Sequence, residues 1–210
     1  MTFDQSRYGL FARCYDALSG ERPVYRAGRL AGISQLRLRP GDRVLDVGCG
    51  TGLDLPLLLR AVGPTGRVVG VDASEAMLSR ARARTRRAGW RNVDLVTGDA
   101  ADLDRLLADT GPVDAALFTY ALSVIEDWEG AWEAVLRRVR PGGRVVVVDL
   151  GLPGGAALPL RPLARLACLA AGADPHREPW RRVLADTDDA SHLKLRAGHV
   201  NVGSGTVRPS

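Results

Sequence analysis

The stretch that decides the fold is Asp46-Val-Gly48-Cys-Gly50-Thr-Gly52, which follows a β-branched run at residues 43–47 and opens a predicted helix. Glycines at alternate positions permit a tight turn and let a ligand approach the backbone closely. Their spacing, G-x-G-x-G, differs from the G-x-G-x-x-G of dinucleotide-binding folds and from the phosphate loop that ends in Gly-Lys-Ser/Thr. Asp46 would repel a pyrophosphate, but it suits a ligand that carries an ammonium group. The stretch therefore predicts a ligand site, and a purely structural turn is the alternative.

Short β-branched runs alternate with longer helical patterns around this loop. Several of the runs are almost entirely apolar, as in strands that are buried on both faces of a parallel sheet. Alternation of this kind favours right-handed crossovers and a doubly wound α/β sheet. Ser123 and Glu126 form a capping-box pattern for the last helix of the series. The predicted strands are residues 43–47, 67–71, 92–96, 113–118 and 144–149, and the predicted helices lie near residues 53–62, 74–88, 101–108 and 124–139.

Two further aspartates end predicted strands. Asp72 ends the second strand, 20 residues after Gly52, and Asp99, within Gly98-Asp-Ala, ends the third. Open α/β sheets bind ligands beside the carboxyl ends of their strands, and an acid after the second strand hydrogen-bonds ribose hydroxyls. Either aspartate alone could instead be a loop or N-cap residue. Three acids at three successive strand ends favour the ligand site.

Residues 44–52 resemble motif I of the class I S-adenosylmethionine-dependent methyltransferases. Asp72 matches the ribose acid of that family, Asp99 matches its aspartate at the adenine edge, and Pro141-Gly142-Gly143 matches the turn before its fifth strand. The resemblance covers about residues 40–150. It implies a Rossmann-like fold, namely a doubly wound, mostly parallel seven-stranded sheet with an antiparallel last strand and an N-terminal helical cap.

The resemblance implies an enzyme whose cofactor is S-adenosyl-L-methionine. Asp46 would help to orient the methionine ammonium through the loop backbone or water, Asp72 would bind the ribose diol, and Asp99 would bind the adenine amino group. Met77 would pack on the adenine face, or it belongs to the helix core. The residues assigned to cofactor binding are Asp46, Gly48, Cys49, Gly50, Thr51, Gly52, Asp72, Ala73, Met77, Asp99, Ala100 and Thr119.

A single domain is expected from 210 residues, of which 46% are hydrophobic and 25% are charged. It would consist of a helical cap (1–38), the cofactor-binding core (40–150) and an acceptor-side insert with a closing hairpin (151–210). No apolar run reaches the ~18 residues of a spanning helix, and no signal peptide is seen. Three cysteines without a CxxC pair favour reduced thiols, so a cytoplasmic protein is expected.

The segment that indicates the methyl acceptor is residues 120–128, Tyr-Ala-Leu-Ser-Val-Ile-Glu-Asp-Trp. They are similar to the segment after the fourth strand in small bacterial lipid-amine N-methyltransferases and, more loosely, in quinone-biosynthesis methyltransferases. Tyr15-Asp16 resembles a Tyr-Asp pair near the start of those proteins. We therefore expect methyl transfer to a small molecule or a lipid head group, with an amine as acceptor, because a neutral amine needs no general base.

Tyr120 and Tyr15 are the catalytic candidates, and the alternative is that the tyrosines only pack the cap. O- or C-methylation in quinone or natural-product biosynthesis is the second functional hypothesis. Aminocarboxypropyl transfer and a non-catalytic cofactor-binding module are alternatives from other classes. Metal binding is not expected, because the three histidines lack ligand spacing.

The net charge of +5 favours anionic partners. One helical face would carry Arg80, Arg84, Arg87 and Arg91, and it suits either an anionic membrane surface or plain solvent. The Leu- and Arg-rich stretch 152–171 would contact an apolar acceptor tail or the membrane interface, or it is an ordinary packed helix. Contact with the inner membrane face would then be peripheral. Nucleic acid is not expected, because no Asn/Asp-Pro-Pro-Tyr/Phe follows the fourth strand.

Overall fold

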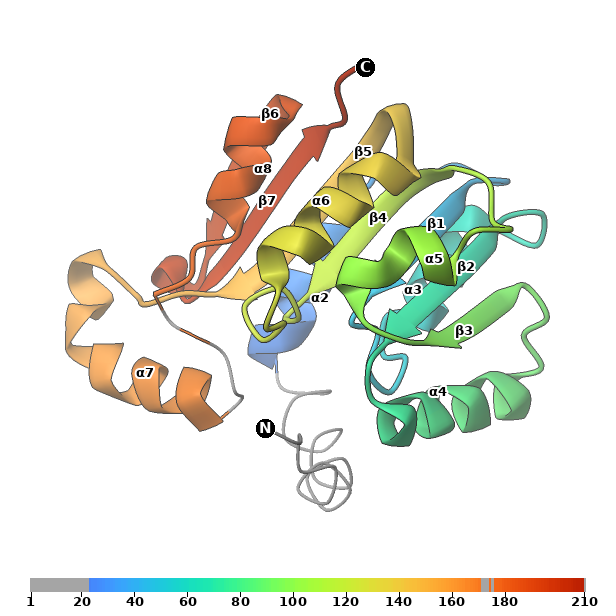
Figure 1. Ribbon diagram of the computed structural model, residues 1–210. Helices are drawn as coiled ribbons and strands as arrows, with labels where there is room; N and C mark the ends of the chain where they lie inside the picture. The colour runs from blue at the N-terminus through green and yellow to red at the C-terminus, as the bar shows by residue number, and fades with distance from the viewer. Residues whose placement is uncertain (1–22, 171–173, 175, 210) are drawn as a thin grey trace.

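The computed structural model describes residues 23–170, 174 and 176–209, and within them one seven-stranded sheet has the order β3-β2-β1-β4-β5-β7-β6 (Figure 1). Strands β1 to β5 are parallel to one another, and β7 is antiparallel to both of its neighbours, β5 and β6. The predicted fold class is thereby confirmed. The strands are β1 (Arg43–Val47), β2 (Arg67–Asp72), β3 (Val93–Thr97), β4 (Val113–Thr119), β5 (Val139–Leu150), β6 (Asp188–Leu195) and β7 (Val200–Thr206).

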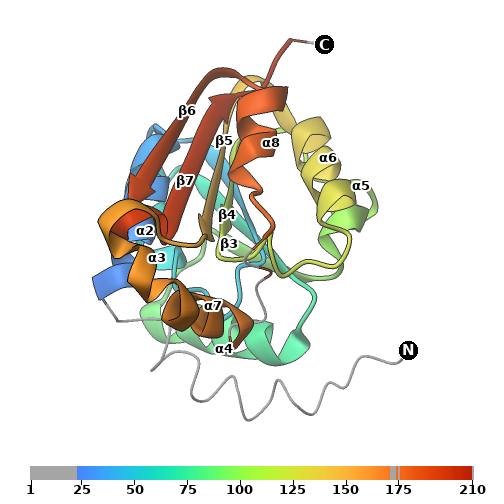
Figure 2. The same ribbon diagram turned by 90° about the vertical axis from the view of Figure 1, so that its left-hand side faces the viewer.

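Helices cover both faces of the sheet, as Figure 2 shows from the side of β6 and β7. One face carries α2 (Pro23–Gln35) and α3 (Leu55–Val62), and the opposite face carries α6 (Trp128–Arg138) and α8 (Trp180–Asp186). Beside β3 and β2 lies α4 (Glu75–Ala88). The shorter elements are η1 (Ala100–Asp102), α5 (Leu103–Leu106), η2 (Gly155–Leu160), α7 (Arg161–Ala170) and η3 (Arg196–Gly198).

Alternating residues of β1 divide the core between the two faces. Val44 packs in the cluster that contains Leu55 and Leu58 of α3, whereas Leu45 packs in the cluster that contains Trp132 of α6. All of these side chains are fully buried. Because the side chains of a strand point alternately to opposite faces, an apolar strand such as this needs helices on both sides.

The approach of α2 to the sheet depends on two glycines one helical turn apart. A Cβ atom at Gly28 would lie 2.2 Å from the Tyr120 hydroxyl, and one at Gly32 would lie 2.3 Å from a Val148 methyl group. Glycine therefore allows this helix to lie directly on β4, β5 and β7. It is the described part of the helical cap that we expect over residues 1–38, and the candidate residue Tyr15 lies outside the described residues.

The element boundaries differ from the sequence predictions around α6 and β5. The capping box is wrong, because the helix begins at Trp128 and its N-cap is Asp127, whose carboxylate accepts a hydrogen bond from the Gly130 amide at 3.0 Å. Ser123 instead donates its hydroxyl to Asp149. Strand β5 begins at Val139, so Pro141-Gly142-Gly143 forms an irregularity within the strand and not a turn before it.

The predicted closing hairpin is confirmed as β6 and β7, joined through η3. Among the helices of the described segments, none is long and apolar enough to cross a bilayer.

Candidate functional site

The glycine loop lies at the carboxyl edge of the sheet, between β1 and α3. The amides of Gly48 and Cys49 both donate to the carbonyl of Val71, at 2.8 and 3.1 Å, which ties the loop to the end of β2. Gly48 has a φ of 67°, and a Cβ there would lie 2.5 Å from that of Ala121. Gly50 also has a positive φ, of 55°, but no atom lies within 4 Å of where its Cβ would stand. The loop is thus packed at Gly48 and open at Gly50.

Asp72 fastens this loop to the neighbouring helix. One carboxylate oxygen accepts a hydrogen bond from the Gly50 amide at 2.7 Å, and the other accepts one from the Ser74 amide at 2.8 Å. Burial raises the pKa of Asp72, and the two amide hydrogen bonds oppose that rise. Each carboxylate oxygen can accept a further hydrogen bond. The side chain can therefore hold the loop and still accept a pair of hydroxyl donors.

Asp46 is a buried carboxylate whose oxygens both lack a hydrogen-bond partner within the described part of the chain. Burial, together with the charges of Asp54 and Asp72, raises its pKa, while the charge of Arg29 lowers it. A buried polar group without a partner costs roughly 1–3 kcal/mol. Such a side chain fits a ligand that brings a hydrogen-bond donor or a positive charge.

A buried ion pair joins α2 to the start of α3, just after the glycine loop. Arg29 of α2 donates to Asp54 at 2.9 Å, and both side chains are almost completely buried. The Arg29 guanidinium also lies 5.9 Å from the centre of the Tyr120 ring. Sequence reasoning missed this pair because the partners are 25 positions apart and belong to different predicted segments.

The remaining cofactor candidates fall at the same edge with mixed environments. Asp99 is exposed and accepts a hydrogen bond from the Ala101 amide at 2.9 Å, so it is the N-cap of η1, with its second oxygen unbonded to any described residue. Met77 and Ala100 are buried, whereas Ala73 is exposed. Thr119, at the end of β4, is buried, and its hydroxyl has no partner among the residues described.

Tyr120 follows β4, and its side chain contacts α2 of the cap. Its hydroxyl donates to the Tyr25 carbonyl of α2 at 2.9 Å, and the two rings meet edge to face with centres 5.3 Å apart. Burial raises its pKa above that of an ordinary phenol. A neutral phenol that already donates its proton to a carbonyl is a poor base, so these contacts favour the packing alternative over a catalytic role for Tyr120.

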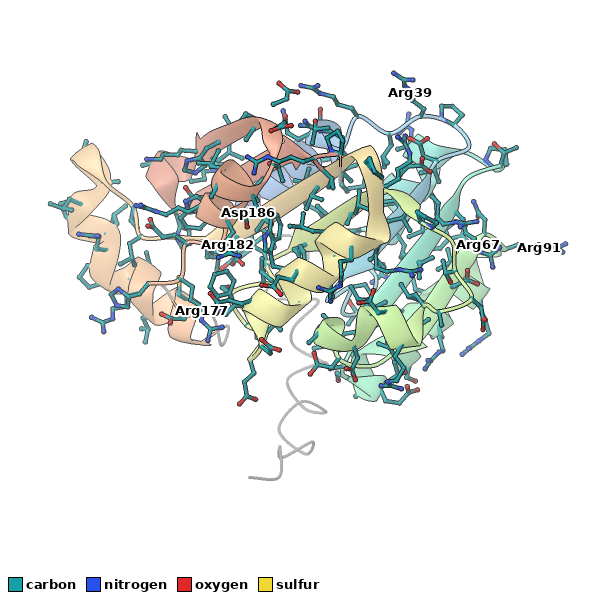
Figure 3. The ribbon with its side chains drawn as sticks, turned by 45° about the horizontal axis from the view of Figure 1, so that its top comes forward. Arg39, Arg67, Arg91, Arg177, Arg182 and Asp186 are labelled. Carbon is teal, nitrogen blue, oxygen red and sulfur yellow. The ribbon has the colours of Figure 1, made fainter. Side chains whose placement is uncertain are left out.

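Asp149 is the penultimate residue of β5 and holds the loop that follows β4. Its carboxylate accepts hydrogen bonds from the Ser123 amide at 2.9 Å, the Ser123 hydroxyl at 2.7 Å and the Leu150 amide at 2.8 Å. Burial raises the pKa of Asp149 to about 6. Arg177 donates to the carbonyls of Ser123 and Ile125, and it lies beside this loop in Figure 3. The loop is therefore fixed from two sides.

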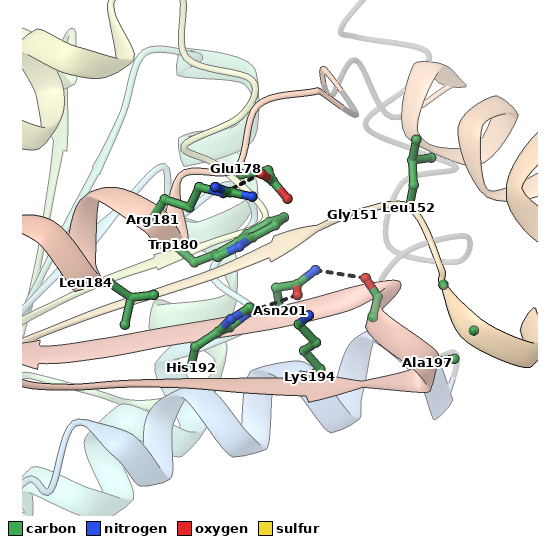
Figure 4. A pocket seen from close by; sticks show the side chains of 13 residues that line it. Gly151, Leu152, Glu178, Trp180, Arg181, Leu184, His192, Lys194, Ala197 and Asn201 are labelled. Carbon is green, nitrogen blue, oxygen red and sulfur yellow. Dashed lines mark hydrogen bonds and ion pairs between the residues drawn. The ribbon is translucent and has the colours of Figure 1, made fainter. Parts of the chain in front are cut away.

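An open cavity of about 460 Å³ lies farther along the same edge, where β5, β6 and β7 meet α8 (Figure 4). The Trp180 ring stacks on His192, with centres 5.7 Å apart. His192 bonds to Asn201 at 2.9 Å, and Asn201 donates to the Gly198 carbonyl, so its oxygen faces the imidazole. Sequence reasoning did not single out this group, because its members come from three segments with no shared spacing.

The structure thus separates two regions of the carboxyl edge. Predicted site residues gather where β1, β2, β3 and β4 end, whereas the cavity lies beyond β5. The strand order places β4, β5, β7 and β6 side by side, so His192 of β6 is three strands away from Tyr120. Neighbouring strands are about 4.8 Å apart. The imidazole is therefore too distant to act at the end of β4.

Comparison with known proteins identifies the core. The sequence profile of a family described as "Methyltransferase domain" matches residues 44–143. Residues 44–143, just under half of the chain, therefore match a methyltransferase domain. The match begins within β1, before the glycine loop, and ends in β5, so it spans the strand ends that carry Asp46, Asp72 and Asp99. This match supports the prediction of an enzyme.

Curated relatives match part of the chain. The demethylmenaquinone methyltransferase of Staphylococcus aureus is 36% identical over 121 residues, covering 58% of this chain and 48% of that protein. Across the curated relatives that it matches, the chain spans from about a third to about half of their length.

Solved structures share the fold of the chain over most of its length. A SAM-dependent methyltransferase from Aquifex aeolicus aligns with a TM-score of 0.63 and 17% identity, over 98% of this chain and all of that chain. Phosphoethanolamine N-methyltransferase 2 of Haemonchus contortus, solved with S-adenosyl-L-methionine, aligns with a TM-score of 0.72 and 14% identity, over 96% of this chain and 57% of that chain.

Proposed function

We propose that the chain transfers a methyl group from S-adenosyl-L-methionine to the amine nitrogen of a small molecule or a lipid head group, without a general base. The observation that carries the choice of acceptor is that the titratable side chains at the ends of β4 and β5 are already engaged. Tyr120 donates to a backbone carbonyl, and Asp149 accepts three hydrogen bonds. A neutral amine can attack without losing a proton first, whereas a hydroxyl acceptor gains from a base.

The cofactor fits the residues at the ends of β1, β2 and β3. The unpartnered carboxylate of Asp46 would accept the methionine ammonium, directly or through water, and Asp72 would accept the ribose hydroxyls while it holds the Gly50 amide. The unbonded oxygen of Asp99 would accept the adenine amino group. When bound, the cofactor supplies an electrophilic methyl group on a sulfonium ion.

The protein's own part in the reaction would be placement of the acceptor and exclusion of water. Two clamps support such a site: Arg29 ties α2 to Asp54 behind the glycine loop, and Asp149 and Arg177 fix the loop after β4. Holding two reactants in an aligned, dry site can lower the barrier by up to about 7–11 kcal/mol. Rigid walls at the ends of β4 and β5 are therefore consistent with catalysis by positioning.

Carbon methylation of a quinone-type ring is the second candidate function. It is favoured by the 36% identity to a demethylmenaquinone methyltransferase. That alignment covers 58% of this chain. The cofactor-binding core of the fold would be common to enzymes with either acceptor, so the identity supports the reaction class more than the acceptor.

The test supplies methyl-labelled cofactor to the purified chain with phosphatidylethanolamine vesicles, a small primary amine or a demethylmenaquinone. The proposal expects label on an amine, with a rate that rises as pH approaches the pKa of the amine, and S-adenosylhomocysteine as co-product. Label on the quinone alone would favour the second candidate. Methylthioadenosine as co-product would indicate aminocarboxypropyl transfer, and cofactor binding without turnover would indicate a binding module.

A further inference from the structure

The segment between β5 and α8 presents four leucines to solvent. It comprises η2 (Gly155–Leu160) and α7 (Arg161–Ala170), and it lies at the carboxyl edge of the sheet in Figure 1. The exposed fractions of four leucines in this segment lie between 52% and 67%: Leu158, Leu160, Leu163 and Leu166. The other exposed leucines of the described chain are scattered and are less exposed, between 41% and 43%: Leu30, Leu184 and Leu193.

The described side chains of α7 are arranged in the reverse of the order expected for a helix that covers a core. A surface helix of a globular protein normally turns its large apolar side chains inward. Here the inward face carries the small residues Ala164 and Cys168, which are buried, while Leu163 and Leu166 point outward. Contiguous exposed apolar side chains mark an interaction surface more often than an ordinary surface.

The charges around these leucines are of one sign. Arg161 and Arg165 are exposed, and neither makes a hydrogen bond or an ion pair with any residue that the structure describes. No aspartate or glutamate occurs from residue 150 to residue 173. Arg161 begins α7, where the helix dipole disfavours a cation, so helix stability does not account for it. Leucines flanked by unpaired arginines complement a surface that is apolar inside and anionic outside.

We infer that residues 155–170 form an interfacial segment that docks on an anionic lipid surface. Leu160, Leu163 and Leu166 would enter the boundary between head groups and acyl chains, and Arg161 and Arg165 would meet lipid phosphates. The inference concerns the surface alone and holds whether the methyl acceptor is a lipid or a soluble molecule. Because vesicle binding is measured without an acceptor, its failure would leave the proposed methyl transfer standing.

The experiment is flotation of the full chain with vesicles of pure phosphatidylcholine or with about one-third phosphatidylglycerol. Binding is expected to anionic vesicles and to fall with added salt. L163Q/L166Q should lower the partition coefficient by at least about tenfold, because leucine burial at the interface is lost. R161Q/R165Q should lower it by about tenfold or more on anionic vesicles and leave binding to neutral vesicles unchanged.

Two matched controls distinguish vesicle binding by this segment from nonspecific hydrophobic adsorption and from an effect of net charge. Leu193→Gln removes an exposed leucine from β6, and R39Q/R60Q removes two exposed arginines at the opposite edge of the sheet, where Figure 3 labels Arg39. Both controls should bind as the wild type does. All variants should keep the wild-type melting temperature.

The inference is overturned if the wild type does not float with anionic vesicles, or if the controls weaken binding as much as the segment variants do. It is also overturned if L163Q/L166Q leaves flotation unchanged but converts a dimer to a monomer in sedimentation, since a second copy would then cover the leucines.

Discussion

Asp46→Asn tests how the buried carboxylate at the start of the glycine-rich stretch would contribute to cofactor binding. Burial and the charge of Asp54 raise the pKa of Asp46 in the free protein. An ammonium group at its unpartnered oxygens would favour the ionised form and lower that pKa again. Binding should therefore release protons, up to one per site, and affinity should rise with pH by up to tenfold per pH unit until the free-protein pKa is passed.

The asparagine variant removes the titration and keeps the shape. A hydrogen bond to a charged group contributes about 1.5–3 kcal/mol and a neutral one about 0.5–1.5 kcal/mol, so the variant should bind about tenfold more weakly at high pH. At low pH, where the wild-type carboxyl is protonated, the two affinities should converge. Asp104→Asn, at an exposed surface pair with Arg137, is the matched control and should behave as the wild type does.

The assay is titration calorimetry with S-adenosylhomocysteine, which keeps the ammonium, in buffers of different ionisation enthalpy. The dependence of the measured heat on the buffer gives the number of protons released. A wild-type affinity that is independent of pH, with no more proton release than Asp46→Asn, would refute the contact between Asp46 and the ammonium.

Three further changes probe the supports of the site. Tyr120→Phe should lower the free energy of unfolding by about 1 kcal/mol, through loss of the hydrogen bond to Tyr25, and leave kcat within a few-fold, whereas loss of kcat alone would restore a catalytic role. Asp149→Asn should flatten the pH dependence of the free energy of unfolding. Because the folded pKa of Asp149 is about 6, above that of an unfolded aspartate, the wild type is destabilised by about 3 kcal/mol as pH rises from below 4 to above 6. An unchanged pH dependence of the melting temperature in the variant would contradict this. Gly32→Ala should cost about 1–3 kcal/mol in chemical denaturation because its Cβ would lie 2.3 Å from a Val148 methyl group, and a neutral effect would show that α2 shifts freely.

The sheet was predictable from the sequence because its signals are local. Each apolar strand run, the glycine loop and each strand-end aspartate can be recognised from a few consecutive residues, and parallel topology brings the strand ends to one edge. Asp72 shows the limit of this reasoning. Its place was predictable, but its hydrogen bonds to the amides of Gly50 and Ser74 depend on the path of the backbone between strands.

The features that escaped prediction depend on contacts between distant segments. Ser123 matches a helix cap in sequence, yet a buried carboxylate 26 positions later takes both its amide and its hydroxyl. The direction of α7 was also open, because the same leucines could cover a core or face outward. In both cases the sequence shows the residue types, but only the packing of the folded chain determines which contact each side chain makes.

The central claim, that the strand-end acids form a site for S-adenosyl-L-methionine, is tested most directly by calorimetry on Asp72→Ala. The wild type should bind the cofactor and S-adenosylhomocysteine at one site per chain. The variant loses a carboxylate that would accept the ribose hydroxyls and already accepts two amide hydrogen bonds. Its affinity should fall at least about 100-fold, since hydrogen bonds to a charged group contribute about 1.5–3 kcal/mol each. Asp94→Ala, at an exposed pair with Arg67 on the neighbouring strand, should bind within a few-fold of the wild type. No binding by the wild type, or equal affinity in the Asp72 and Asp94 variants, would contradict the account.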